Sequence, residues 1–185
     1  MIVLGIDLGN KSRNAIAVIN ESHQLLDYSC QLYDGSITVW QHRKNICNQI
    51  QNYINKYDLT KEDYIIFEKI NLFVGSRVSR LVNITSLAFI QATIINEFSD
   101  KITIVEVNVQ TWKNTVLGSR SATKEDSVNY VEKNYHKVDL DIFVLHKRKA
   151  DEIVKNNDLS DAICIGVFGH IGDKKKILDN IVNYT

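Results

Sequence analysis

The chain has 185 residues, of which 22 are lysine or arginine and 22 are aspartate or glutamate, so its formal net charge is zero. A chain of this length fits one folded unit, because single cores usually run to about 100–200 residues, and we expect one domain over residues 1–185. The balanced charge excludes a general attraction for polyanions, so a nucleic-acid surface must come from local basic clusters. No apolar stretch approaches the ~20 residues that cross a bilayer, and no export signal precedes the first apolar run, so we expect no membrane partner.

The three cysteines, Cys30, Cys47 and Cys164, are odd in number, widely spaced and without a Cys-x-x-Cys pair. Two of them lie in apolar segments, as packed thiols do. This usage is typical of a reducing, intracellular compartment, and it predicts no structural zinc site.

The first part of the chain has the pattern of three strands, a helix and a further strand. Residues 2–7, 15–19 and 24–31 are strand patterns with turn-forming residues between them, which predicts an antiparallel start. Residues 40–57 carry apolar side chains at helical spacing, and residues 64–67 form a short apolar run typical of a buried strand.

Helices and strands alternate in the rest of the chain. The pattern predicts a long helix at 78–98, a strand at 102–107, helices at 109–117 and 123–135, and a strongly apolar helix at 158–170. Three hairpin strands, then alternating helices and strands, then a helix with acidic residues is the element order of the RNase H-like fold. We therefore expect an α/β protein with a central mixed five-stranded sheet flanked by helices.

Acidic side chains stand at the ends of two predicted strands and at the start of the last helix. Asp7 lies between apolar neighbours in the first strand, and Glu68 closes the strand at 64–67. If these two strands are neighbours, both carboxylates emerge at the carboxyl edge of the sheet, where α/β folds place ligand sites. Asp158 and Asp161 are three residues apart and share one face of a helix, with about 5–6 Å between their Cβ atoms.

Four carboxylates in one cluster repel one another unless cations neutralise them. Mg²⁺ and Mn²⁺ prefer oxygen ligands, and two such ions about 3.5–4 Å apart can clamp the attacking and leaving oxygens of a phosphoryl displacement. The acids therefore predict a metal-dependent nuclease.

Structural roles are the alternative for each acid. Asp158 fits a helix N-cap with Asp161 as an acidic residue of the first turn, and Glu68 fits a charge that ends a strand. Asp7 is the hardest to explain in this way, because burying a lone aspartate without partners or a metal is costly.

Four segments, in matching order along the chain, resemble the signatures of RuvC-family Holliday junction resolvases, members of the RNase H-like superfamily. Three of them carry the acids: Gly-Ile-Asp-Leu-Gly at 5–9, the strand-end Glu68, and Asp-Leu-Ser-Asp-Ala at 158–162. The fourth is residues 112–124, in which Lys113 and Lys124 flank a Val-Leu-Gly turn, similar to the paired basic residues of that family. The length of the segment between Asp139 and Asn157 suits a phage or poxvirus-type member.

The resemblance implies a crossover junction endodeoxyribonuclease that binds branched DNA, above all four-way junctions, as a homodimer. It would nick two opposing strands and leave 5′-phosphate ends, in DNA recombination and repair or in phage genome processing. Asp7, Glu68, Asp158 and Asp161 would hold two Mg²⁺ ions per active site, with Mn²⁺ able to substitute. The expected location is the cytoplasm, or the host cytoplasm for a phage-encoded protein.

The resemblance also implies DNA-contacting residues. Lys113 and Lys124 would contact phosphates near the scissile bond, with Lys124 stabilising charge in the transition state; without the resemblance, both fit solvated charges around a helix start. Phe73 is the candidate for an aromatic wedge in the junction, and Arg77 and Arg80 for phosphate contacts. The helix that these arginines open, at 78–98, corresponds to the element that the family uses for dimer contacts.

Two basic runs bracket the last acidic helix. The run at 146–149 supplies Lys147, Arg148 and Lys149 as expected DNA contacts, although such a run is usually a solvated surface. The other run is at 174–176.

Two other functions are compatible with parts of the pattern. Residues 5–9 also resemble the first phosphate loop of sugar kinases and actin-like ATPases, but those need a far longer chain and further glycine-rich loops. A catalytically silent junction-binding module is the other alternative, but a decayed site should have lost at least one acid, and all four are present.

Overall fold

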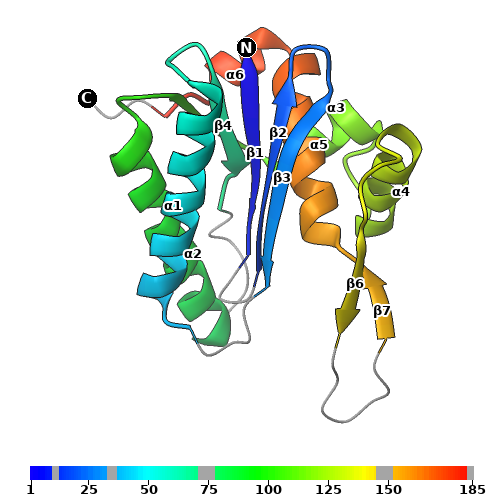
Figure 1. Ribbon diagram of the computed structural model, residues 1–185, viewed down its shortest axis with the longest axis horizontal. Coiled ribbons are helices and arrows are strands. Elements are labelled where there is room, and N and C mark those ends of the chain that lie inside the picture. The colour runs from blue at the N-terminus through cyan, green and yellow to red at the C-terminus, as the bar shows by residue number, and fades with distance from the viewer. Residues whose placement is uncertain (10–12, 33–36, 71–77, 145–151, 183–185) are drawn as a thin grey trace.

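Five strands form one mixed sheet in the order β3-β2-β1-β4-β5 (Figure 1). The computed structural model describes residues 1–9, 13–32, 37–70, 78–144 and 152–182. The strands of this sheet are β1 (Ile2–Leu8), β2 (Arg13–Asn20), β3 (Leu25–Leu32), β4 (Tyr64–Glu68) and β5 (Thr103–Val107). The first three pair antiparallel, whereas β1 with β4 and β4 with β5 pair parallel. The predicted mixed five-stranded sheet is confirmed.

Helices cover both faces of this sheet. They are α1 (Val39–Tyr57), α2 (Val78–Phe98), α3 (Val109–Leu117), α4 (Lys124–Asn134), α5 (Asn157–Ile171) and α6 (Lys174–Leu178). Figure 1 shows α1 and α2 on one face and α5, with α3 and α4 outside it, on the other. Within β1, Leu4 and Ile6 pack in the core under α1 and α2, and Val3 packs in the core under α5. This alternation follows from the two-residue period of a strand.

Helix α1 begins with a capping box at Thr38. The Thr38 side chain accepts a hydrogen bond from the Gln41 backbone N–H, and the Gln41 side chain accepts one in return from Thr38. The second bond runs from the Thr38 backbone N–H to Gln41 Oε1, so the pair satisfies two backbone donors at the start of the helix. The helix then buries Ile46, Ile50 and Ile54 against the sheet.

Helix α5 is apolar all round because it is covered on both sides, by β1 and β2 on one and by α3 and α4 on the other. Its approach to β1 depends on glycine. A Cβ atom at Gly5 would overlap the carbonyl oxygen of Ala162 and the backbone of Gly166. The middle of α5 is thereby held directly against the strand that carries Asp7.

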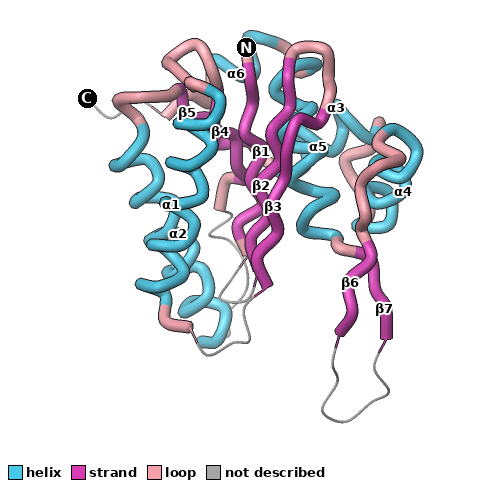
Figure 2. Tube along the Cα trace, in the orientation of Figure 1, coloured by secondary structure: helices cyan, strands magenta, loops and turns pink. Residues whose placement is uncertain are grey.

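A strand pair and a short helix were not among the sequence predictions. β6 (Asp141–Val144) and β7 (Glu152–Lys155) form a separate antiparallel pair, and Figure 2 shows it extending beyond the helical layers. Each strand is four residues long, too short for periodicity to signal. At its base, the Lys155 ammonium lies 2.8 Å from a Glu132 carboxylate oxygen and 2.7 Å from one of Asp141. The second missed element is the five-residue helix α6, which contains the basic run at 174–176.

None of the helices in the described ranges is long and apolar enough to cross a membrane.

Candidate active site

Asp7 and Glu68 lie side by side at the carboxyl edge of the sheet. β1 and β4 run parallel with Ile6 opposite Phe67, so Asp7 and Glu68 are the next residues along their strands. Both side chains line a cavity of about 250 Å³. The other lining residues come from the ends of these strands, from α2 and from the start of α3: Leu8, Lys69, Ile70, Ile84, Leu87, Gln91 and Val109. The predicted convergence of these two acids is therefore present.

Asp158 and Asp161 lie in the first two turns of α5. Neither is the N-cap, because the Asn156 side chain accepts the hydrogen bond from the Leu159 backbone N–H at 3.0 Å. The alternative of Asp158 as a helix cap is wrong for this reason. Asp161 is 9% exposed, and its Oδ1 atom has no hydrogen-bond partner among the described residues. A buried carboxylate oxygen without a donor is costly and is typical of a site that receives a cation.

The acids on β1, β4 and α5 act on one another electrostatically. Burial raises the pKa of Asp7 well above its ordinary value, and the charges of Glu68, Asp161 and Asp158 raise it further. Burial is also the main cause of the raised pKa values of Glu68 and Asp161. The four acids are therefore close enough for their charges to act on one another, and we call them the acidic cluster.

Trp112 holds Glu68 in place, and sequence reasoning assigned it no role. Its indole Nε1–H donates a hydrogen bond of 2.8 Å to Glu68 Oε1, and its side chain is fully buried in α3. This bond lowers the pKa of Glu68 against the effect of burial. The Gln91 side chain on α2 donates a further bond of 2.7 Å to the Glu68 backbone carbonyl. The sequence offers one signal for this role. Trp112 stands next to the predicted site residue Lys113, and an indole N–H needs an acceptor when it is buried.

The charges of the two predicted lysines act on the acidic cluster. The charges of Lys113 and Lys124 both lower the pKa values of Glu68 and Asp161. Lys113 Nζ donates a bond of 2.7 Å to the Ala122 carbonyl, which ties α3 to the turn before α4. Lys124 is exposed at the first position of α4, where Thr123 caps the helix. Lys113 thus has a structural bond as well, whereas Lys124 presents its charge at the helix start.

The oxygen atoms of the four acids can be compared with the ligands that a divalent metal ion prefers. All four acids offer hard oxygen ligands, and Asp161 Oδ1 is buried without a partner in the part of the chain that the structure describes, which fits Mg²⁺ or Mn²⁺ by chemistry. Within the described ranges, however, no group of three or more His, Cys, Asp or Glu side chains is placed so that it could hold a metal ion. The residues fit by type and location, and their side chains must converge further for one ion to bind three of them.

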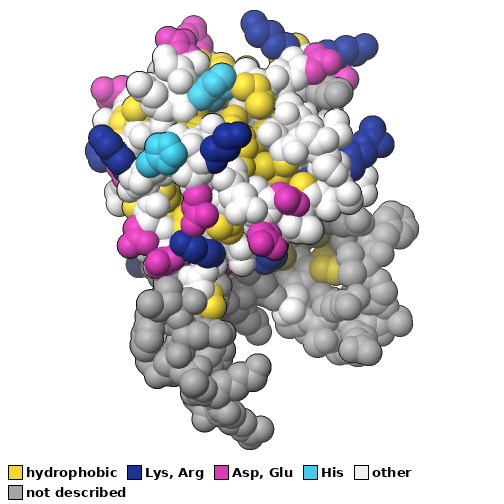
Figure 3. Space-filling model, turned by 90° about the vertical axis from the view of Figure 1, so that its right-hand side faces the viewer, with side chains coloured by type: hydrophobic (Ala, Val, Ile, Leu, Met, Phe, Trp, Pro, Cys, Tyr) yellow, Lys and Arg dark blue, Asp and Glu magenta, His cyan; other side chains and the backbone are white. Residues whose placement is uncertain are grey.

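Most of the other predicted DNA contacts lie outside the described residues: Phe73, Arg77, Lys147, Arg148 and Lys149. Arg80 lies in the first turn of α2. Figure 3 shows the face on the α4 side, where acidic and basic side chains are interspersed over the described part. The described part of this face therefore has a mixed rather than a basic surface.

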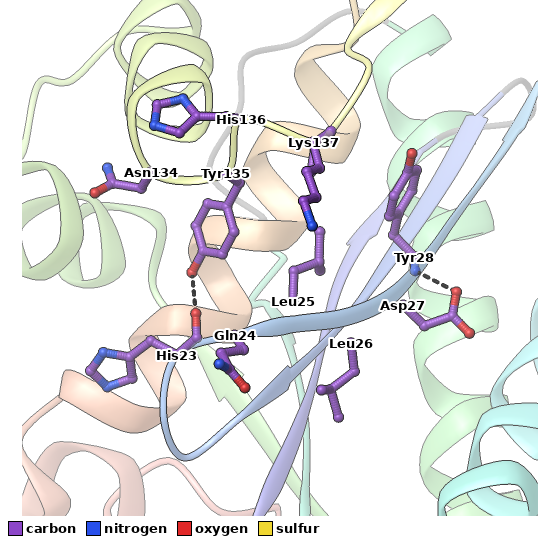
Figure 4. A pocket seen from close by; sticks show the side chains of 11 residues that line it. His23, Gln24, Leu25, Leu26, Asp27, Tyr28, Asn134, Tyr135, His136 and Lys137 are labelled. Carbon is purple, nitrogen blue, oxygen red and sulfur yellow. Dashed lines mark hydrogen bonds between the residues drawn. The ribbon is translucent and has the colours of Figure 1, made fainter.

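A second cavity, of about 510 Å³, is separate from the acidic cluster. It lies between the start of β3 and the segment that follows α4, and it is lined by residues 23–28 and 134–138 (Figure 4). The Tyr135 hydroxyl donates a bond of 2.9 Å to the His23 carbonyl at its edge. Since none of the predicted site residues lines it, it does not belong to the candidate active site.

Comparison with known proteins identifies the fold. No family model matches the sequence, and a search of curated proteins finds no match. Among solved structures, Thermus thermophilus RuvC matches with a TM-score of 0.62 at 14% identity, over 93% of this chain and 97% of that one. T. thermophilus RuvC in complex with a Holliday junction substrate matches with a TM-score of 0.68 at 13% identity, over 98% and 99% of the two chains. The chain has a RuvC-like, RNase H-like fold. At this identity the likeness establishes the fold, so a function must be argued from the site.

Proposed function

We propose that the protein is a metal-dependent DNA endonuclease that resolves four-way junctions, and related branched DNA, by paired nicks. The observation that carries the proposal is the meeting of Asp7 and Glu68 at one edge of the sheet, close enough to Asp161 and Lys124 for those charges to act on both. A RuvC structure with a Holliday junction substrate has the same fold, which supports this choice of substrate.

Asp7, Glu68, Asp158 and Asp161 would hold two Mg²⁺ ions, with Mn²⁺ able to substitute. The ions would supply an activated water and neutralise the charge on the departing 3′ oxygen, so that products carry 5′-phosphates. Trp112 keeps the Glu68 carboxylate oriented toward the cluster. Lys124 places a positive charge where a phosphate would lie, and it is our candidate for stabilising the transition state.

Paired nicks need two active sites, which a two-fold symmetric homodimer would provide, and α2 is the proposed dimer element. Assignment to a phage or poxvirus-type member stays part of the proposal and rests on the segment at 139–157, where the β6–β7 pair lies. A cytoplasmic location and a single domain over residues 1–185 are also parts of the proposal.

The test is a cleavage assay on end-labelled four-way junctions, linear duplex and flap DNA, with Mg²⁺, Mn²⁺ or EDTA. We expect symmetric nicks on junctions that need a divalent metal and are lost in Asp7→Asn. Asp100→Asn is the matched control, because Asp100 is exposed and lies between α2 and β5, at the opposite edge of the parallel strands.

Other results would contradict the proposal. Nicking that Asp7→Asn leaves unchanged, or no metal-dependent nicking at all, refutes the mechanism. Tight junction binding without cleavage would instead indicate a silent binding module, and ATP turnover would indicate a kinase-like activity.

A further inference from the structure

An exposed tryptophan stands on the first turn of α1. Trp40 is 60% exposed, and its ring packs edge-to-face with that of Phe89 on α2, with ring centroids 4.8 Å apart at 75°. The Arg43 guanidinium lies 5.3 Å from the Trp40 ring centroid and 5.7 Å from that of Phe89. The Trp40 ring is therefore held by two neighbours although most of its surface faces solvent. We call Trp40, Arg43 and Phe89 the Trp40 cluster.

The two helices that carry the Trp40 cluster also contribute residues next to the candidate active site. On α1, burial lowers the pKa of His42, and an interaction with the Gly9 backbone, two residues beyond Asp7, opposes this shift. On α2, Leu87 and Gln91 line the same cavity as Asp7 and Glu68, while Phe89, two residues from each, lies on the other side of the helix. Figure 1 shows α1 beginning at the end of the sheet where β1 and β4 finish.

The chemistry of the cluster suits a nucleotide. Nucleobases stack on aromatic rings whatever their sequence, and an adjacent guanidinium adds attraction for both the base and a phosphate. The first turn of α1 contains no acidic residue, and the exposed Lys44 follows Arg43, so this end of the helix complements a polyanion. DNA bound with a phosphate at the acidic cluster would have its neighbouring nucleotides within reach of this edge.

We propose that Trp40 is a stacking platform for an unpaired or splayed base of the branched DNA, with Arg43 holding the indole ring and contacting a nearby phosphate. This rests on the proposed nuclease function, since it supplies a nucleotide site beside the acids. It is distinct from the wedge role expected of Phe73, because Trp40 lies on α1 and not in the segment after Glu68.

The experiment measures binding of synthetic four-way junctions that carry 2-aminopurine at the branch point, in Ca²⁺ or EDTA so that cleavage does not interfere. We expect Trp40→Ala to weaken binding by about 5- to 150-fold and to abolish quenching of the fluorescent base, whereas Trp40→Phe keeps most of both. Tyr28→Ala is the matched control, since Tyr28 is another exposed aromatic, 38% exposed, that lines the separate cavity. Tryptophan fluorescence gives a second measurement. The chain has two tryptophans and Trp112 is fully buried, so a loss of tryptophan fluorescence on adding DNA reports on Trp40.

Each contrary outcome has a separate meaning. If Trp40→Ala binds junctions and quenches the base as the wild type does, the stacking site is refuted, whether or not the wild type nicks DNA. If Trp40→Ala shifts the DNA-free protein from dimer to monomer in sedimentation, Trp40 is a subunit contact and the proposal is also refuted. If the wild type binds and quenches but never nicks, the nuclease function fails while the stacking site stands.

Discussion

Replacing Trp112 with phenylalanine removes one hydrogen bond from Glu68 while keeping an aromatic ring in the core. The bond is 2.8 Å long, and its donor is fully buried. A hydrogen bond to a charged group contributes about 1.5–3 kcal/mol, which is about a 10- to 150-fold change in an equilibrium constant. Groups that orient metal ligands usually contribute about 10–100-fold to metal affinity. We therefore expect Trp112→Phe to need about 10–100-fold more Mg²⁺ for half-maximal nicking.

The pH dependence gives a second, independent readout. Burial raises the pKa of Glu68, and the bond from Trp112 lowers it, so the variant should have a still higher Glu68 pKa. Only the ionised carboxylate binds a metal well, so the acidic limb of the pH–rate profile should move to higher pH.

Phe98→Leu is the control for lost packing, because Phe98 is buried in the core on the other face of the sheet. It should lower the melting temperature without changing the metal requirement or the pH profile. The reasoning is refuted if folded Trp112→Phe has the wild-type metal requirement and the wild-type acidic limb.

Three further predictions concern the acids, the lysines and the contact between β1 and α5. In EDTA, the acids with raised pKa values contribute stability that is fully present below about pH 4 and is lost as pH rises through their folded pKa values, so the melting temperature measured by calorimetry should fall over this range. Asp7→Asn should reduce that fall, and Mg²⁺ in place of EDTA should offset it in the wild type only. Lys124→Met should lower kcat by about 10²–10³-fold with little change in melting temperature. Lys113→Met should lower both kcat and melting temperature, because Lys113 also donates a bond to a backbone carbonyl before α4. Equal melting temperatures of the two variants would contradict this structural role of Lys113. Gly5→Ala should destabilise by about 1–3 kcal/mol or more, or about 2–4 °C per kcal/mol in thermal unfolding, because its Cβ would overlap the Ala162 carbonyl; a wild-type melting temperature would show that α5 can move away.

Much of the fold could be predicted from local patterns. The strand and helix order up to α4, and the start of α5, follow from runs of apolar residues with periods of two and 3.6, which report on the segment itself. Such patterns failed for β6 and β7, where four residues per strand are too few, and for the short helix α6. Short elements depend on what they pack against, and this is not written in their own residues.

The site was predictable in part for the same reason. Asp7 and Glu68 could be singled out because a carboxylate in or after an apolar strand has no local explanation. The cap of α5 could not be assigned in this way, since Asn156 and Asp158 are both good N-cap residues and only the backbone path decides between them.

The sequence by itself determined the order of the sheet strands β1–β5 and of the helices α1–α5, and it singled out the four acids and the two lysines, because each is visible in residues close together in the chain. Only the tertiary structure decided which of these residues meet. The parallel register of β1 and β4 places Asp7 beside Glu68, and Trp112 reaches Glu68 across 44 positions of sequence. Contacts of this kind depend on how the sheet and helices pack together, and an indole N–H has a partner only once the fold has excluded water around it.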